Sequence, residues 1–87
     1  MKYVIEEVPQ FWEDGYFDNH PYQRHEILTL NVSREEAMIF FNNLKQEHEF
    51  IAEDDYREGN VFAFYLVEKD DDNDTREIDY FLFEEQN

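Results

Sequence analysis

The sequence predicts an α+β fold in which one α-helix packs on an antiparallel sheet of four to five strands. Apolar residues alternate in segments 26–32 and 77–84, which predicts strands, and they recur at helical spacing in segment 33–48, which predicts a helix. Because a chain of 87 residues can bury only one modest core, residues 1–87 are expected to form a single domain. The expected order of elements is β-β-α-β-β-β.

The N-terminal part of the chain is expected to hold one short strand and one long ordered loop. Residues 3–8 favour a strand, and Pro9 is expected to end it because proline has no N–H for the ladder. Residues 11–25 fit neither the strand period nor the helix period, and they mix aromatic side chains with Gly15 and Pro21. We therefore expect an aromatic loop that covers one face of the sheet.

A capping motif marks the start of the helix. The alternating strand at 26–32 is followed by Ser33, and Glu36 lies three residues further on, as in a capping box. The helix is expected to end at about Glu47 or His48. The stripe expected to face the sheet consists of Ala37, Phe40, Phe41 and Leu44.

Three further strands are expected after the helix. Residues 50–55 are predicted to form a strand that pairs, through a turn at Gly59, with residues 61–68. Residues 61–68 are apolar at odd and even positions alike, so this strand is expected to be central in the sheet. The last strand is expected at 77–84, and residues 85–87 are expected to fray. In that strand, Ile78, Tyr80 and Leu82 are expected on one face and Asp79, Phe81 and Phe83 on the other, with Phe81 and Phe83 either in the core or at a dimer seam.

The net charge is the most informative feature for function. The chain has 23 acidic and 7 basic residues, which gives a formal charge of -16. Such self-repulsion destabilises a compact domain, so we expect the charge to be spread out or to serve a function. A negative surface repels nucleic acid and anionic membranes and attracts basic grooves, and the few basic residues are scattered along the chain. The expected partner is therefore a basic protein, with no direct nucleic-acid or membrane binding.

Several other classes are not expected. The chain contains no Cys, no signal peptide and no long apolar run, which favours a cytoplasmic protein. Its one Ser is the helix cap, and no glycine-rich phosphate loop is present, so we do not expect an enzyme or a cofactor. Asp70, Asp72 and Asp74 match the first three positions of a calcium loop, but Thr75 and Phe81 stand where that loop needs Gly and Glu, so no metal is expected.

The acidic residues gather in five groups along the chain. These groups are Glu6 and Glu7; Glu13, Asp14 and Asp18; residues 47–58; residues 68–79; and Glu84 and Glu85. Glu77 and Asp79, two apart on one predicted strand face, would lie ~6.5 to 7 Å apart, close to the step between neighbouring phosphates. The residues predicted to contact the partner are Glu53, Asp54, Asp55, the aromatic neighbour Tyr56, Asp70, Asp71, Asp72, Asp74, Glu77 and Asp79.

In size, charge and mixed acidic and aromatic composition, the whole chain resembles the small phage-encoded anti-defence proteins, which include anti-CRISPR and anti-restriction DNA mimics. The resemblance implies an inhibitor, acting in the host cytoplasm as a monomer or homodimer, that blocks the basic groove of a DNA- or RNA-binding protein such as a defence nuclease. Two alternatives stay open: an acidic adaptor that binds a basic protein without imitating nucleic acid, and a domain whose charge serves solubility.

Overall fold

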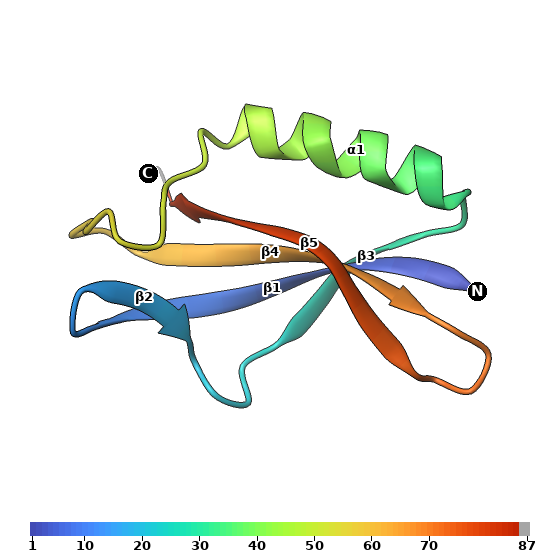
Figure 1. The fold of residues 1–87 in the computed structure, drawn as a ribbon, viewed down its shortest axis with the longest axis horizontal. Helices are drawn as coiled ribbons and strands as arrows, with labels where there is room; N and C mark the ends of the chain where they lie inside the picture. Colours follow the sequence, from blue (N-terminus) through green and yellow to red (C-terminus); the bar gives the residue numbers. More distant parts are fainter. Residues whose placement is uncertain (86–87) are drawn as a thin grey trace.

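The computed structural model describes residues 1–85 and shows an α+β fold, as predicted (Figure 1). The element order is β-β-β-α-β-β, so the predicted order was wrong in placing one strand too many after the helix and one too few before it. The elements are β1 (Lys2–Glu13), β2 (Tyr16–Asn19), β3 (His25–Leu30), α1 (Arg34–Glu47), β4 (Val61–Lys69) and β5 (Thr75–Glu84).

The strands form one antiparallel sheet with β4 at its centre, between β1 and β5. The strands β2 and β3 share one edge of β1, where β2 pairs with residues 10–13 and β3 with residues 3–7. The first three strands therefore form one long hairpin that is interrupted at residues 20–24. The prediction that residues 61–68 form the central strand is confirmed, and β4 is buried on both faces.

The predicted end of the first strand at Pro9 was wrong, because β1 continues through Pro9 to Glu13. The carbonyl of Pro9 accepts a hydrogen bond from the amide of His20, so the backbone of Pro9 faces the side of β1 where β3 has ended and β2 has not yet begun. A missing N–H costs no ladder bond at that point.

The aromatic loop predicted at 11–25 was also wrong, because most of it is a hairpin. Asp14 and Gly15 have positive φ angles of 47° and 100°, and they turn the chain from β1 into β2. An Asp-Gly pair is a strong hairpin signal, since both residues tolerate this conformation. The expected aromatic cover is present only in part: Phe17 is buried and packs edge-on against Trp12 with ring centroids 5.0 Å apart, whereas Tyr16 and Tyr22 are exposed.

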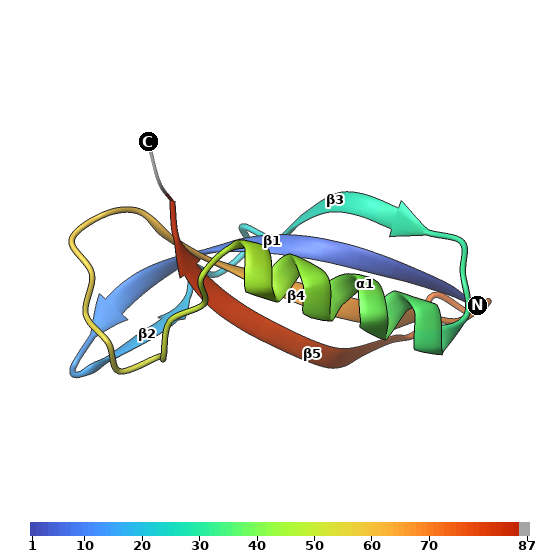
Figure 2. The same ribbon diagram turned by 90° about the horizontal axis from the view of Figure 1, so that it is seen from above.

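The helix is confirmed in position and in its cap. The Ser33 side chain accepts a hydrogen bond from the amide of Glu36 at 3.2 Å, and its hydroxyl donates to the Glu36 carboxylate at 3.0 Å. Seen from above, α1 lies over β4 (Figure 2). Ala37 and Phe41 are buried against the sheet, whereas Phe40 stays 40% exposed.

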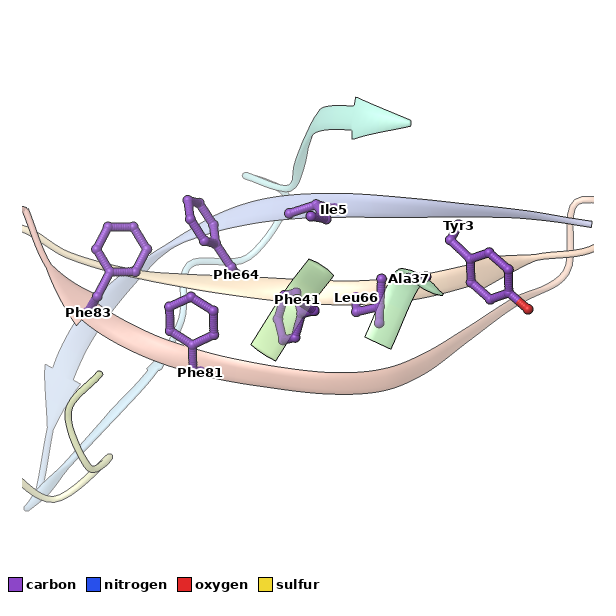
Figure 3. Close-up of a cluster of buried hydrophobic side chains, with 8 residues drawn as sticks. All are labelled: Tyr3, Ile5, Ala37, Phe41, Phe64, Leu66, Phe81 and Phe83. Atoms are coloured by element: carbon purple, nitrogen blue, oxygen red, sulfur yellow. The ribbon is translucent and has the colours of Figure 1, made fainter. Parts of the chain in front are cut away.

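The main core lies between α1 and the sheet (Figure 3). Phe41 packs against Phe81 with ring centroids 5.2 Å apart, and Phe81 and Phe83 belong to this core rather than to a dimer seam. The buried members of the cluster are Tyr3, Ile5, Ala37, Phe41, Phe64, Leu66, Phe81 and Phe83.

The opposite face of the sheet is closed at one end by a short connecting segment. The strand predicted at 50–55 was wrong, because this segment makes only an isolated bridge between Ile51 and Leu82. The Ile51 amide donates to the carbonyl of Leu82 in β5, and the carbonyl of Glu53 accepts from the amide of Phe17 in β2. Residues 51–53 thus join the two sheet edges, so this half of the sheet curls around a second core cluster. That cluster is made of Val8, Phe17, Val61, Ala63, Tyr65, Val67 and Leu82.

A bulge in β5 changes which side chains share a face. The register shifts between Leu66 and Val67, so Asp79 lies opposite Leu66 while Glu77 lies opposite Val67, and Ile78 is the extra residue. Ile78 therefore packs against the helix-side core, and its predicted place beside Tyr80 and Leu82 was wrong.

The predicted fraying of the tail concerns three residues, of which Gln86 and Asn87 lie outside the described residues. Glu85 is held in place, because its amide donates to the carbonyl of Asn60 at 2.8 Å.

A candidate anionic partner-binding site

One end of the molecule gathers carboxylates from segments that are far apart in the sequence. The turn between β1 and β2, the connection 49–60, and the end of β5 meet there, on the left of Figure 1. Contacts between these segments hold them together: Trp12 packs edge-on against Tyr56 at 5.1 Å, and the Gly59 amide donates to Glu84 at 3.0 Å. We call this region the acidic end. Its carboxylates are Glu7, Glu13, Asp14, Glu47, Glu49, Glu53, Asp54, Asp55, Glu58, Glu84 and Glu85, about half of the 23 in the chain.

A hollow of about 400 Å³ opens at the acidic end, beside the C-terminus of α1. Its floor is aromatic: Phe64 and Phe83 lie 4.6 Å apart, and the ring of His48 lies 4.6 Å from Phe83. The carboxylates around it come from β1, from the end of the helix and from the end of β5. We call this feature the acidic hollow, and it is lined by Glu7, Glu47, His48, Glu49, Phe64, Phe83, Glu84 and Glu85.

The local backbone explains how Glu47 and Glu49 reach the acidic hollow. The helix ends when the His48 amide donates to the carbonyl of Leu44, and Glu49 then adopts a left-handed conformation with φ of 48°. That conformation turns the chain back toward β5. Two carboxylates are thereby presented on either side of His48 rather than along a continuing helix.

Little positive charge offsets the carboxylates of the acidic hollow. Arg57 pairs with Asp55 at 2.8 Å and with Glu84 at 3.6 Å, and the hydrogen bond to Asp55 raises the pKa of the Arg57 guanidinium. Lys45 lies over the ring of Phe50, 4.5 Å from its centroid. An aromatic floor with a carboxylate rim is the environment that a guanidinium or ammonium group of another protein would favour.

The predicted residues Glu53, Asp54, Asp55 and Tyr56 lie at the acidic end. The hydroxyl of Tyr80 donates to the Glu53 carboxylate, and this hydrogen bond raises the pKa of Tyr80 to about 12. Tyr56 is 56% exposed, so it remains available as the aromatic neighbour that the sequence suggested. This predicted group is therefore part of the acidic end, but Glu53 lines a second hollow, together with Tyr65, Glu77 and Tyr80, and not the acidic hollow.

The predicted residues Asp70, Asp71, Asp72 and Asp74 lie at the opposite end of the molecule, in the turn between β4 and β5. The nine residues of β4 separate them from the acidic end, a length of about 27 Å. Asp70 has a structural role, since its side chain accepts hydrogen bonds from the amides of Asp72 and Asp74. Asp71 lies 3.4 Å from the positive N-terminus. The structure therefore does not join this turn to the 53–56 group in one surface.

Glu77 and Asp79 do not form the phosphate-like pair that the sequence suggested. The bulge at Ile78 puts the two side chains on opposite faces of β5, so the two-residue spacing no longer holds. Glu77 is ion-paired with Arg24 at 2.8 Å.

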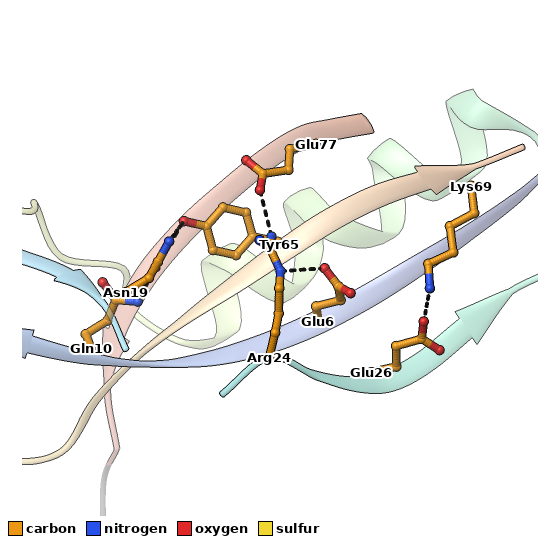
Figure 4. A network of polar contacts seen from close by, with 8 residues as sticks. All are labelled: Glu6, Gln10, Asn19, Arg24, Glu26, Tyr65, Lys69 and Glu77. Atoms are coloured by element: carbon orange, nitrogen blue, oxygen red, sulfur yellow. Dashed lines mark hydrogen bonds and ion pairs between the residues drawn. The ribbon is translucent and has the colours of Figure 1, made fainter. Parts of the chain in front are cut away.

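Three carboxylates on the face away from the helix, Glu6, Glu26 and Glu77, are paired with cations (Figure 4). Arg24 lies 4.5 Å over the ring of Tyr65 and bonds to both Glu6 and Glu77 at 2.8 Å. Lys69 donates to Glu26, and this bond holds the pKa of the Glu26 carboxyl below its usual value. The contrast with these ion pairs indicates that the acidic hollow carries more unbalanced negative charge than this part of the sheet.

The residues that line the acidic hollow were not among the predicted contact residues, although the carboxylates among them belong to acidic groups that the sequence shows. Glu7, the 47–49 segment and Glu84 with Glu85 belong to three of the five acidic groups. Their convergence depends on β1 and β5 flanking β4 and on the helix ending above them. No local pattern reports that arrangement.

Comparisons with protein-family models, with curated proteins and with solved structures found no match to this chain. Within residues 1–85, no helix is both long enough and apolar enough to cross a bilayer.

Proposed function

We propose that this chain is an acidic inhibitor that binds the basic groove of a DNA- or RNA-binding protein and excludes nucleic acid from it. The acidic end is the contact surface. The observation that carries the proposal is the convergence of three separate acidic groups on one aromatic-floored hollow. A phage-encoded protein directed against a defence nuclease would have this chemistry.

The acidic end supplies both terms that such binding needs. A concentrated negative field steers a basic protein toward the site and raises the association rate at low salt. Phe64 and Phe83 offer an apolar floor on which an arginine or lysine side chain loses water, and such desolvated contacts dominate binding energy. The negative charge therefore accounts for fast association with the partner, and contacts in the acidic hollow account for slow dissociation.

An acidic adaptor is the second candidate, and one observation favours it. The hollow of about 400 Å³ is a single pocket rather than a row of evenly spaced charges, so it suits one anchoring side chain of a specific protein. Competition separates the two functions, because a mimic must be displaced by nucleic acid and an adaptor need not be.

The test uses three proteins: the wild type, a hollow variant and a turn variant. The hollow variant carries Glu7→Gln, Glu47→Gln, Glu49→Gln and Glu85→Gln. The turn variant removes the same formal charge at the opposite end through Glu35→Gln, Asp71→Asn, Asp72→Asn and Asp74→Asn. Each is titrated into a guide-loaded CRISPR nuclease, a restriction endonuclease and a nucleoid protein bound to fluorescent duplex DNA.

We expect the wild type and the turn variant to displace DNA from at least one of these proteins and the hollow variant to fail. The displacement should weaken steeply as salt rises. Loss of activity in the turn variant alone would move the site to the β4–β5 turn. Capture of a basic protein that excess DNA does not release would replace mimicry with the adaptor function.

A further inference from the structure

The outer edge of β3 offers backbone groups for pairing with another strand. In an antiparallel pair, the N–H and C=O of one residue point to the same side, and successive residues alternate. The carbonyl of Pro9 accepts from the His20 amide, so the backbone of Pro9 faces β2 and β3. Since β1 pairs with β4 without interruption from Lys2 to Pro9, the backbones of Tyr3 and Ile5 also face β3.

This parity identifies the groups on the free edge. Leu28 lies opposite Ile5 and Leu30 lies opposite Tyr3, so both leucines form the ladder with β1. The N–H and C=O of Thr29, between them, therefore point away from β1 and into solvent. The register shift beside them leaves Ile27 as an extra residue, which limits the regular edge to the segment around Thr29.

Other edges of the sheet are covered or charged. The outward amide of Phe17 in β2 is bonded to Glu53, and the outward carbonyl of Leu82 in β5 is bonded to Ile51. The remaining edge of β5 carries Glu77, Asp79 and a bulge, which are devices that discourage pairing. The edge of β3 instead presents apolar side chains, with Ile27 48% exposed and Leu28 41% exposed.

The same segment is almost free of the charge that dominates the chain. Residues 19–34 contain a single carboxylate, Glu26, together with Arg24 and Arg34, in a protein of net charge -16. Glu26 is itself paired with Lys69. A second copy of this chain can therefore approach most closely at β3, because local repulsion is smallest there.

Strand β3 is also complementary to itself. When two copies pair antiparallel with Thr29 opposite Thr29, Leu28 of each copy lies opposite Leu30 of the other. Four leucines then form two cross-strand apolar pairs on the helix side of the sheet, because these side chains share the face of Ile5 and Tyr3. In this register Glu26 lies opposite Val32 rather than opposite Glu26, so no like charges meet.

We propose that the protein forms a twofold homodimer in which β3 pairs with β3 of a second copy and joins the two sheets. Only the short regular segment around Thr29 forms the interface. We therefore expect the area buried per partner to be smaller than the roughly 800 Å² of a standard interface, and the dimer to be weak and dependent on concentration. Its salt dependence is opposite to that of partner binding, because salt screens the repulsion between two copies of charge -16.

Sedimentation equilibrium tests the proposal from about 10 μM to 1 mM, a range that brackets weak association. The mass should rise from 10.8 kDa toward twice that value. The dissociation constant should fall several-fold between 0.05 and 0.5 M NaCl, as the Debye length shortens from above 10 Å to a few Å. Partner binding should weaken over the same range, so failure of one proposal is distinguishable from failure of the other.

Two variants and one control locate the interface. Thr29→Pro removes an N–H that points away from β1, and should raise the dissociation constant roughly 10- to 100-fold through loss of two intermolecular hydrogen bonds. Thr29→Val keeps the N–H and should leave the constant within a factor of about 3. Leu28→Asp places a charge opposite Leu30 of the second copy, and it tests the same pairing if Thr29→Pro lowers the content of folded protein.

A monomeric mass at every concentration and salt would overturn the proposal. So would a dimer whose constant is unchanged in folded Leu28→Asp protein, because the association would then use another surface. A constant that rises with salt would contradict the assignment to the uncharged edge.

Discussion

Neutralising the acidic hollow should stabilise the free protein, because its carboxylates repel one another. A spherical cavity of 400 Å³ has a diameter of about 9 Å, and two unit charges at that distance in water repel by about 0.5 kcal/mol. The five carboxylates form ten pairs, which amount to about 5 kcal/mol without salt and about 2 kcal/mol at 0.1 M salt, where the Debye length is ~10 Å.

The hollow variant with four Glu→Gln changes keeps only Glu84, which accepts from the Gly59 amide and pairs with Arg57. Since an unfolded chain retains part of the repulsion, we expect the free energy of unfolding to rise by about 1 to 2 kcal/mol at 0.1 M NaCl. At 1 M NaCl, where the Debye length is ~3 Å, the gain should nearly disappear. Urea denaturation followed by circular dichroism at both salt concentrations measures the two values.

A second variant, with two Glu→Gln changes instead of four, separates repulsion within the acidic hollow from the effect of a lower total charge. Glu26→Gln with Glu77→Gln also makes the protein less negative, but it removes carboxylates that are paired with Lys69 and Arg24. This double variant should gain no stability. If the hollow variant is less stable than the wild type, or if its gain is the same at 1 M salt, the five carboxylates do not destabilise the folded protein through mutual repulsion, and their clustering needs no functional explanation.

Three further predictions concern the fold. Phe41→Ala, at a side chain only 1% exposed, should lower the free energy of unfolding by about 3 to 5 kcal/mol in a urea titration, and a loss below 1 kcal/mol would contradict its central place in the core. Ser33→Ala should cost about 1 kcal/mol by removing the bond to the Glu36 amide, and an unchanged urea midpoint would refute the cap. Tyr80→Phe should cost about 1 kcal/mol at neutral pH, since the hydroxyl that donates to Glu53 is partly exposed. Because the pKa of Tyr80 is raised from 10.0 to about 12, the difference from wild type should be complete below pH 10 and vanish as pH rises toward 12, and a constant difference would exclude the bond.

The parts of the fold that sequence predicted are those governed by local pattern. Ser33 and Glu36 fixed the helix start because a cap is a contact between near neighbours. The apolar run at 61–68 identified the central strand because a strand that is buried on both faces has apolar side chains at odd and even positions alike. The Asp14–Gly15 turn was equally local, and the hairpin was missed because the aromatic residues around it obscured the alternation.

The remaining features depend on contacts between distant segments. Residues 51–53 resemble a strand in composition, yet they bridge β5 and β2 through Ile51 and Glu53. The bulge at Ile78 reverses the face of Glu77, and only pairing with β4 reveals it. The predicted contact residues are consequently spread over the acidic end, the β4–β5 turn and strand β5, while Glu7 and Glu47 join a site that no single segment suggests.

The two proposed surfaces lie on different parts of the molecule and can act together. The acidic end lies beyond the start of β4, whereas the regular edge of β3 around Thr29 lies beside residues 3–5 of β1, and only the first residue of β3, His25, pairs with Glu7 of the acidic hollow. Antiparallel pairing through β3 leaves both acidic hollows open and points them in opposite directions. A dimer therefore cannot place both hollows in one narrow groove, but it can hold two partner molecules.

Adding the wild type to a partner at high concentration should then give complexes with two partner molecules. The Thr29→Pro variant should give complexes with one partner molecule, at unchanged affinity per site. If Thr29→Pro instead weakens binding at each site, β3 belongs to the partner interface and the two surfaces are one.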